Sequence, residues 1–297
     1  MTAQPDLEPY RPELLAHLYR MLGSVHDAED AVQETLLRAW RGLDRFEGRS
    51  SVRGWLYRIA TNVALTAIER RGRQPVPSDE DVIEPLPDDA LGPAATAEQR
   101  ERVELAFVAA LQHLPPNQRA ALLLRDVLGL SAAEVAEAME TSVAAVNSAL
   151  QHARAGIEGR VPPESQQETL RALGDEGVRA LVGRYTAALQ AGDVEAMVAL
   201  LADDVTWSMP PLAECYSGLE AVRGFLARGP MTRRWRHLPA RANGQVAVGC
   251  YMLDETGEYR AYALDVLDLR GDRVAAVTAF LDGSLFAASG LPPVMSP

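Results

Sequence analysis

The stretch that decides the fold of the N-terminal part reads DAEDAVQETLLRAW and runs from Asp27 to Trp40. Its apolar residues recur with helical spacing, at positions 28, 31, 32, 35, 36, 39 and 40. Asp30 and Glu34 fall together with Asp27 on a second face of the same helix. The spacing predicts an amphipathic helix over residues 26–41, whose acidic face is either solvated or a contact surface.

A second helix is predicted after a short loop. Residues 46–62 read FEGRSSVRGWLYRIATN, and the serines of the loop can cap a helix that extends to about Arg70. Residues 38–73 carry nine arginines and three acids, with four of the seventeen aromatic residues. Because arginines neutralise phosphates and aromatic rings stack on unpaired bases, this composition indicates contact with nucleic acid. The alternative is that Trp40 and Trp55 are core residues.

Charge is distributed unevenly along the chain. Its 297 residues carry 29 basic side chains, all of them arginine, and 41 acidic ones, so the net charge is −12. This total by itself argues against a nucleic-acid binder, but local charge sets what a surface attracts. The basic stretch is followed by residues 74–110, which have two arginines, nine acids and five prolines. This composition predicts an extended acidic linker over residues 74–97.

Composition also bounds the class of protein. Cys215 and Cys250 are too few for a disulfide framework or a cysteine-rich metal site, and the five histidines lack ligand spacing. We expect no metal and no cofactor. The first residues are polar and no run of eighteen apolar residues occurs, so neither secretion nor a membrane span is expected. The sequence predicts a cytoplasmic protein.

Residues 98–158 read as a second helical module. A helical pattern over 98–113 is followed by a helix that starts at Pro115 or Pro116 and ends before Gly129. Ser131 and Glu134 form a capping box for a short helix, and Thr141-Ser142 caps another over 143–155. This is the layout of a helix-turn-helix, whose second helix enters the major groove of DNA. A helical scaffold without DNA binding is the alternative.

Residues 176–297 read as a third module, separated from the second by a linker over residues 159–175. Helices are predicted first, and strands follow them, with a hairpin signal at Gly271-Asp272. The order predicts an α+β domain with helices on one face of a curved sheet. The expected helices cover 178–190, 194–201 and 219–228, and the expected strands cover 205–209, 244–253, 259–269 and 273–281.

The first stretch, together with residues 46–62, closely resembles region 2 of bacterial RNA polymerase sigma factors of the extracytoplasmic-function type. Residues 114–154, which include LLLRDVLG at 122–129 and SVAAVNSALQ at 142–151, resemble region 4 of the same factors. Glu140 stands in the turn of this helix-turn-helix, where a glycine is common. The resemblance covers both helical modules.

The resemblance implies the partners core RNA polymerase (β′ clamp and β flap) and promoter DNA, together with a role for individual residues. The first helix is implied to dock on the polymerase with Asp30, Gln33, Glu34 and Arg38. The loop and second helix are implied to read the −10 element and hold the melted strand with Phe46, Arg49, Ser50, Arg53, Trp55, Arg58 and Asn62. The last helix of the second module is implied to read the −35 element with Ser142, Val143, Asn147, Ser148, Gln151 and Arg154.

The third module resembles the SnoaL-like branch of the cone-shaped NTF2-like fold, in particular the versions fused behind this class of sigma factor. The resemblance rests on Tyr185, Gly192-Asp193, the run 200–211, Tyr216-Ser217-Gly218 and the run 241–245. It implies a pocket and a regulatory domain that contacts the sigma modules or the linker, with a small ligand of its own. The candidate pocket residues are Trp207, Met209, Tyr216, His237, Tyr262 and Asp265.

The sequence therefore predicts two all-α sigma domains, 1–73 and 98–158, followed by an α+β SnoaL-like domain. The predicted function is a sigma factor, not an enzyme, that binds core polymerase, directs initiation at specific promoters and is modulated by its third domain. Two alternatives remain at this point: a SnoaL-class isomerase or cyclase with a DNA-binding appendage, and a conventional helix-turn-helix regulator. The acidic face of the first helix favours the sigma factor, because a plain regulator has no use for it.

Overall fold

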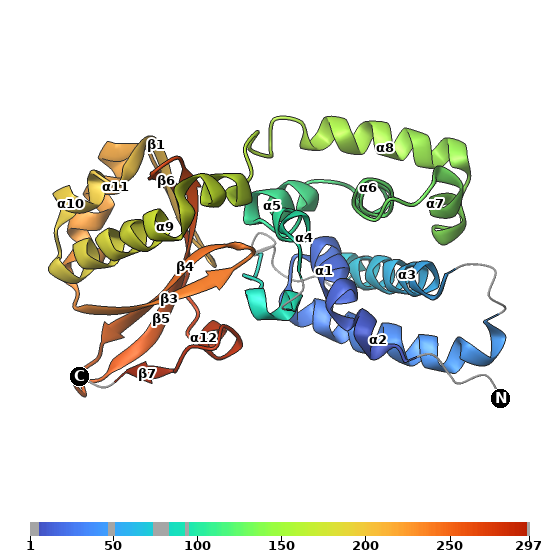
Figure 1. The fold of residues 1–297 in the computed structure, drawn as a ribbon, viewed down its shortest axis with the longest axis horizontal. Coiled ribbons are helices and arrows are strands. Elements are labelled where there is room, and N and C mark those ends of the chain that lie inside the picture. The colour runs from blue at the N-terminus through green and yellow to red at the C-terminus, as the bar shows by residue number, and fades with distance from the viewer. Residues whose placement is uncertain (1–5, 47–50, 74–82, 93–94, 296–297) are drawn as a thin grey trace. The chain divides into compact units, whose positions relative to one another are not determined.

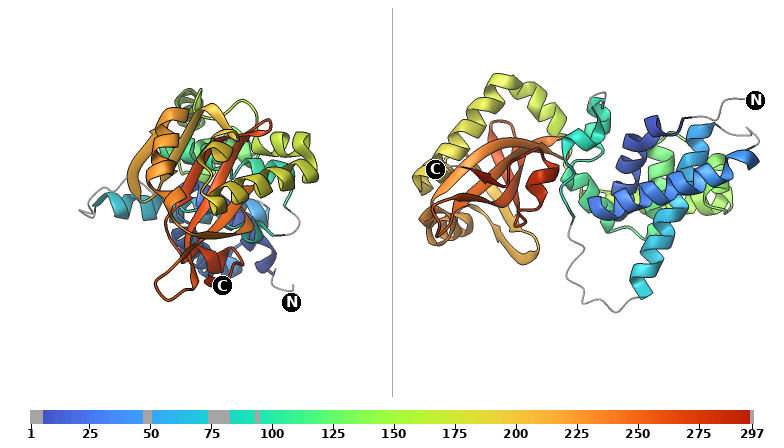
Figure 2. Two further views of the ribbon diagram at one scale, coloured as in Figure 1. Left: turned by 90° about the vertical axis from the view of Figure 1, so that its left-hand side faces the viewer. Right: turned by 90° about the horizontal axis from the view of Figure 1, so that it is seen from below.

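The computed structural model describes residues 6–46, 51–73, 83–92 and 95–295. The chain divides into two compact units (Figures 1 and 2), one within residues 1–86 and 90–162 and the other within residues 87–89 and 163–297. The first unit is helical and the second combines helices with one sheet. This agrees with the predicted fold class.

The first unit contains the helices of both predicted helical modules. In chain order these are η1 (Glu8–Tyr10), α1 (Arg11–Leu22), α2 (Val25–Gly42), η2 (Leu43–Arg45), α3 (Val52–Arg73), α4 (Ala97–Glu101), α5 (Leu105–Gln112), α6 (Pro116–Leu122), the π-helical segment η4 (Leu123–Val127), α7 (Ala132–Ala138) and α8 (Val143–Ile157).

Helices α2 and α3 confirm the two helices expected from residues 26–41 and 51–70. The side chain of Ser24 caps α2 by accepting a hydrogen bond from the backbone N–H of Asp27. Of the predicted apolar stripe, Ala28, Ala31, Val32, Thr35 and Ala39 are buried. Trp40, at the edge of the stripe, is 64% exposed and is not a core residue.

The helix-turn-helix is formed by α7 and α8. Ser131 and Glu134 form the expected capping box, and the Ser142 hydroxyl accepts the N–H of Ala145 at the start of α8. The pattern over 98–113 does not form one continuous helix. It is broken between α4 and α5, where Val103 turns into the core and is fully buried.

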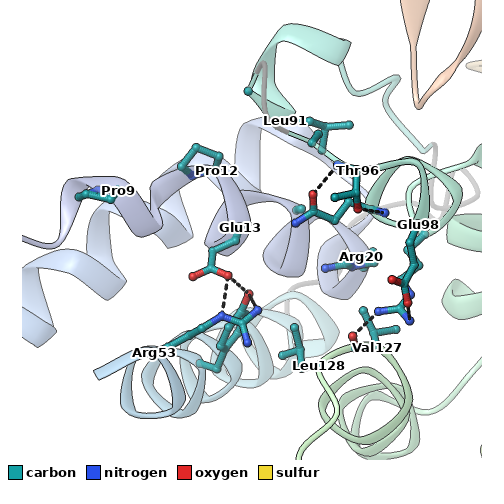
Figure 3. Close-up of a pocket in the computed structure, with 16 residues that line it drawn as sticks. Pro9, Pro12, Glu13, Arg20, Arg53, Leu91, Thr96, Glu98, Val127 and Leu128 are labelled. Carbon is teal, nitrogen blue, oxygen red and sulfur yellow. Dashed lines mark hydrogen bonds and ion pairs between the residues drawn. The ribbon is translucent and has the colours of Figure 1, made fainter. Parts of the chain in front are cut away.

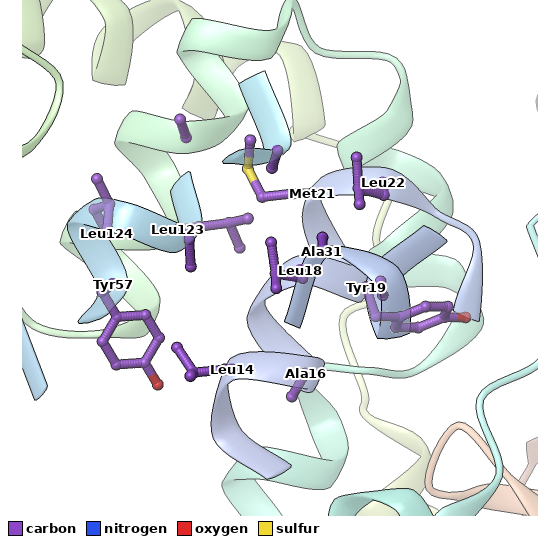
Figure 4. Packing of buried hydrophobic residues seen from close by; sticks show 14 of the residues in the cluster. Leu14, Ala16, Leu18, Tyr19, Met21, Leu22, Ala31, Tyr57, Leu123 and Leu124 are labelled. Carbon is purple, nitrogen blue, oxygen red and sulfur yellow. The ribbon is translucent and has the colours of Figure 1, made fainter. Parts of the chain in front are cut away.

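The helices of the two predicted modules share one hydrophobic core (Figure 4). Leu18 and Met21 of α1 belong to the same buried cluster as Leu123 and Leu124 of η4. Tyr57 of α3 joins this cluster from a third segment. The core therefore connects the first and second helical modules in one unit.

Over its described residues, the second unit consists of α-helices, a short turn and a sheet. Its helices are α9 (Gln166–Ala191), α10 (Val194–Val198), α11 (Leu219–Arg228) and α12 (Leu285–Ala288), with the turn η5 (Pro230–Thr232). Its strands are β1 (Leu201–Met209), β2 (Leu212–Ser217), β3 (Trp235–Ala242), β4 (Gln245–Leu253), β5 (Tyr259–Arg270), β6 (Arg273–Phe280) and β7 (Val294–Met295).

The sheet has the order β2-β1-β6-β5-β4-β3, with β7 paired to β5. Only β1 and β6 run parallel among these pairs. Helix α9 packs on β3, β4 and β5, and α11 packs on β1 and β2. Residues 271 and 272 form the expected tight turn, because Arg270 pairs with Arg273 across it and Gly271 adopts a positive φ of 57°.

Helix α9 begins inside the range predicted as the second linker. Ser165 and Glu168 form a capping box at its start, and a kink follows at Gly174. Gln166 is buried and exchanges two hydrogen bonds, of 3.0 and 2.7 Å, with the backbone of Leu269 on β5. These polar side chains mark a docked segment, although their composition resembles that of a solvated linker.

Candidate nucleic-acid and polymerase interfaces

The predicted polymerase-binding residues lie on the solvent-facing side of α2. Asp30, Gln33 and Arg38 are exposed and Glu34 is half-buried. The Arg38 guanidinium donates to the Glu34 carboxylate at 2.6 Å, one helical turn away. The helix therefore presents a polar surface on which Glu34 and Arg38 form an ion pair beside Asp30 and Gln33.

Two large apolar side chains share the exposed side of α2. Leu37 is 50% exposed and Trp40 is 64% exposed. Sequence analysis did not include Leu37, although its position outside the apolar stripe could have identified it as an exposed side chain. Exposed apolar side chains beside charged ones are typical of protein-binding surfaces.

The predicted −10 residues on α3 are already engaged within the first unit. The Arg53 guanidinium donates to the Glu13 carboxylate of α1 at 2.8 Å. Arg58 lies 3.8 Å from the Glu137 carboxylate of α7. Asn62 lines a cavity together with Met139, which follows α7.

The aromatic residues of this region pack against each other. The rings of Phe46 and Trp55 lie 4.9 Å apart, and Trp55 is only 9% exposed. Burial of Trp55 agrees with the core interpretation for one of the two tryptophans. Arg49 and Ser50 lie outside the described residues.

The predicted −35 residues on α8 are all exposed. This set comprises Ser142, Val143, Asn147, Ser148, Gln151 and Arg154. On the opposite side of the helix Val146, Leu150 and Ala153 are buried. The Arg154 guanidinium makes two hydrogen bonds to the Asp126 carboxylate, of 2.7 and 2.9 Å. Helix α8 therefore presents one polar face that the rest of the first unit leaves open.

The turn before α8 contains a strained residue. Glu140 adopts a φ of 52°, a left-handed conformation that costs a residue with a Cβ about 1–2 kcal/mol. This is the position where a glycine is common in the resembling family. The glutamate therefore adopts the backbone conformation that a glycine would adopt without strain.

The second half of the acidic linker is packed against the protein. Leu86 is fully buried in the core of the first unit, and the Tyr19 hydroxyl donates to the Glu84 carbonyl at 2.7 Å. The following residues, through the turn η3 (Asp88–Leu91), include a contact within the second unit. The Asp88 carboxylate accepts the N–H of Gly244 at 2.7 Å and the guanidinium of Arg241 at 3.2 Å. Residues 74–82, which form the first part of the predicted linker, lie outside the described part of the chain.

The second unit encloses a cavity of about 320 Å³ between the sheet and the helices. Five of the six predicted pocket residues line it: Trp207, Met209, His237, Tyr262 and Asp265. Tyr216 is not among the lining residues and instead stacks on Phe225, whose ring lies 4.4 Å away. Trp235 and Cys250 also line the cavity and were not predicted to do so, although the period-two spacing of β4 places Cys250 on the inner face.

Asp265 is the central polar group of this cavity. Its carboxylate accepts hydrogen bonds from the Tyr185 hydroxyl at 2.8 Å and from the Cys250 thiol at 3.3 Å. Burial raises the pKa of Asp265 to about 6, although these two donors favour the ionised form. Burial also raises the pKa values of Tyr185 and Cys250, so both remain protonated donors at neutral pH.

His237 lies on the neighbouring strand β3, opposite Cys250. Both of its ring nitrogens are buried and have no hydrogen-bond partner among the described residues. Burial lowers the pKa of His237 to about 4, so the ring is neutral at pH 7. The cavity thus combines an apolar lining with one partnered carboxylate and one neutral imidazole.

Two further features are absent from the described ranges. Within these ranges, no group of three or more His, Cys, Asp and Glu side chains is arranged to hold a metal ion. None of the helices in these ranges combines the length and the apolar character needed to cross a membrane.

Three family models match successive parts of the chain. Sigma-70 region 2 matches residues 7–74, Sigma-70 region 4 matches residues 104–156, and a SnoaL-like domain matches residues 182–277. These matches coincide with the helices α1–α3, with α5–α8 and with most of the second unit.

Two proteins of Mycobacterium tuberculosis resemble the chain over nearly its whole length. ECF RNA polymerase sigma factor SigG of strain H37Rv is 46% identical over 311 residues, which cover 96% of this chain and 82% of SigG. ECF RNA polymerase sigma factor SigJ is 29% identical over 301 residues, which cover 96% and 94% of the two chains. The crystal structure of SigJ superposes with a TM-score of 0.68 at 26% identity and covers 96% of this chain.

Proposed function

The chain belongs to the extracytoplasmic-function RNA polymerase sigma factors, and we propose that α2 binds core polymerase, that α3 reads the −10 element and that α8 reads the −35 element. Sigma factors are transcription initiation factors that bind core RNA polymerase and promoter DNA. The observation that carries the proposal is that all three helices lie in the matched sigma regions, and that the polar residues predicted on α2 and α8 are directed away from the core. We expect the protein to act in the cytoplasm, where the polymerase is.

Helix α2 is the proposed contact with the β′ clamp of the polymerase. Asp30 and Gln33 are exposed, and Leu37 adds an apolar contact beside them. The double variant Asp30→Arg/Gln33→Ala should weaken binding to core polymerase at least about tenfold, because a reversed charge opposes the partner surface. The affinity is measured by fluorescence anisotropy with labelled full-length protein.

The matched control for this experiment is Asp272→Arg. It reverses one exposed acidic residue in the turn between β5 and β6, outside the proposed surface. Unchanged polymerase affinity in the Asp30→Arg/Gln33→Ala protein, with its fold retained by circular dichroism, would refute the assignment of α2.

Helices α3 and α8 are the proposed readers of the −10 and −35 elements. These elements are about 25 base pairs apart, or about 85 Å along the duplex. In the first unit, however, Arg58 of α3 approaches Glu137 of α7 to 3.8 Å, and the two sigma modules share a core. A closed unit of this kind cannot reach both elements at once, so polymerase binding must separate α3 from α7 and α8. The β flap is the proposed partner of the separated region 4.

The SnoaL-like domain is proposed to restrain this opening through the linker. The carboxylate of Asp88 accepts the N–H of Gly244, in the turn between β3 and β4, and the guanidinium of Arg241, near the end of β3. Each hydrogen bond to a charged group contributes about 1.5–3 kcal/mol. The domain therefore fixes the end of a linker that has to extend when the sigma modules separate.

Asp88→Ala tests this restraint, and Asp89→Ala is the matched control with the same charge change on an exposed neighbour. The promoter for the assay is the one whose transcripts increase most when the protein is overproduced. Asp88→Ala should raise transcription from this promoter several-fold in a reconstituted assay, and Asp89→Ala should not. Equal transcription by both variants would disprove regulation through this contact.

The SnoaL-like domain is proposed to act without catalysis. This proposal is supported by the relatives, which are transcription initiation factors. The cavity alone does not decide the point, because Tyr185 and Cys250 both donate to Oδ2 of Asp265 and no described residue donates to Oδ1, the oxygen that a general base would use. A substrate screen in which turnover depended on Asp265 and His237, and was lost in Asp265→Asn and His237→Ala, would instead establish an enzyme.

A further inference from the structure

The first unit contains a cavity whose most buried cation lacks a counter-ion (Figure 3). The cavity has a volume of about 490 Å³, within the range of about 300–1,000 Å³ that is typical of small-molecule sites. Arg20 of α1 lines it and is only 4% exposed. The guanidinium of Arg20 has no carboxylate and no hydrogen-bond partner among the described residues, and its Nε is fully buried.

The other two arginines of the cavity are neutralised. Arg53 pairs with Glu13, and Arg102 donates to the Glu98 carboxylate and to the carbonyl of Val127. Figure 3 shows Arg20 between these two groups. The three arginines and two glutamates among the lining residues leave a net charge of +1, located at Arg20.

An unpaired buried cation of this kind is expensive. Removing a charge from water is unfavourable unless a partner compensates it. Burial lowers the pKa of Arg20 to about 10; the nearby Tyr57 hydroxyl opposes this shift and the charge of Arg102 adds to it. The group is therefore still protonated at neutral pH. Helix α1 therefore keeps a full positive charge at the wall of a cavity.

The remaining lining suits an organic molecule. Leu91 and Leu128 give the cavity apolar walls, and the Tyr57 hydroxyl and the Gln99 amide add hydrogen-bonding groups. Arginine binds phosphate and carboxylate groups through two parallel N–H donors, which makes either anion a matched partner. We propose that this cavity binds a small organic anion whose phosphate or carboxylate group pairs with Arg20.

The binding experiment uses the full-length protein without polymerase, so its result does not depend on the proposed sigma function. Adenosine monophosphate, succinate and inorganic phosphate are titrated by isothermal calorimetry at constant ionic strength, which sodium chloride maintains. At least one probe should bind with saturation at one site. Binding of adenosine monophosphate and phosphate alone assigns a phosphate group, and binding of succinate alone assigns a carboxylate.

Three variants connect the binding to Arg20. Arg20→Met should weaken the affinity at least about tenfold, because it removes a charged hydrogen-bond donor. Arg20→Lys keeps the charge and should retain part of the affinity, and it decides the matter if Arg20→Met does not fold. Arg270→Met, which removes an exposed arginine paired with Asp204 in the second unit, should bind as the wild type does. The proposal is overturned if no probe binds with saturation, or if the folded Arg20 variants bind as tightly as the wild type.

Discussion

Helices α3 and α8 carry the two candidate DNA-reading surfaces. The two surfaces differ in how far their residues are paired or buried within the first unit. The polar residues of α8 are exposed, and the only charged one, Arg154, pairs with Asp126 at the edge of the face. On α3, Arg53 is tied to Glu13, Arg58 lies beside Glu137 and Trp55 is buried.

From this difference we expect α8 to be open to DNA in the described arrangement of the first unit, and α3 to need rearrangement first. A helix with an open face can approach a duplex without rearrangement. A helix whose arginines are already paired has to exchange those partners for phosphates. Of these contacts, only the one between Arg58 and Glu137 crosses between the two sigma modules, because Glu13 lies on α1 in the same module as α3. Separation of the modules would therefore release Arg58 and leave Arg53 paired.

The largest effect is expected from a cavity in the hydrophobic core that the module of α3 shares with the module of α8. Leu123→Ala removes a fully buried side chain that packs with α1 and should lower the free energy of unfolding by about 3 kcal/mol. Urea unfolding followed by circular dichroism measures this. Leu37→Ala, at an exposed position of α2, is the control and should cost less than about 0.5 kcal/mol. Equal costs would contradict a core shared by the two modules.

Acid should lower the stability of the first unit through the contact between α1 and α3. His17 of α1 is fully buried, and its Nε2 lies 3.0 Å from the Thr61 hydroxyl of α3. Burial lowers its pKa from the reference value of 6.5 to about 3. The unfolded chain therefore binds the proton first, and stability is lost as the pH falls from 6.5 towards 3.

Between pH 7 and pH 5 this loss amounts to about 2 kcal/mol, at about 1.4 kcal/mol per pKa unit. Urea unfolding at the two pH values should show that His17→Gln loses about this much less stability than the wild type. His152→Gln, at an exposed position of α8, should respond to pH as the wild type does. If His17→Gln lost as much stability between pH 7 and pH 5 as the wild type does, His17 would not be the source of the acid sensitivity.

The exposed face of α8 should contribute directly to promoter affinity. Asn147 and Gln151 are exposed and carry amides that can hydrogen-bond to base edges. The double variant Asn147→Ala/Gln151→Ala should weaken binding of the polymerase complex to its promoter about tenfold. Ala155→Ser, on the same helix, is the control. An unaffected double variant would mean that this face does not read DNA.

The smallest effect is expected in the turn that positions α8. Glu140→Gly removes the strain of a left-handed φ but increases the freedom of the unfolded chain. The net result should be a gain of about 0.5 kcal/mol in stability, measured by urea unfolding, with promoter affinity unchanged. Ala155→Gly, inside α8, should instead cost about 1 kcal/mol. A loss of stability in Glu140→Gly would show that the turn needs the glutamate side chain.

Much of the fold follows from local sequence. Helical spacing identified α2 and α3, and the capping boxes at Ser131 and the cap at Ser142 identified α7 and α8. The hairpin at Gly271 followed from a turn of two residues. Strands β2 and β3 were not anticipated, because β2 is exposed along most of its length and β3 lacks a fully buried face.

The sequence by itself determined the types of modules, their order and the polar residues on each candidate surface, because helix periodicity and capping act over a few neighbouring positions. Only the tertiary structure decided which of those residues are free. It paired Arg53 with Glu13, forty positions away, and buried Gln166 against β5. It also left Arg20 at a cavity without a counter-ion. Such contacts depend on segments that are distant in the chain, and no local pattern encodes them.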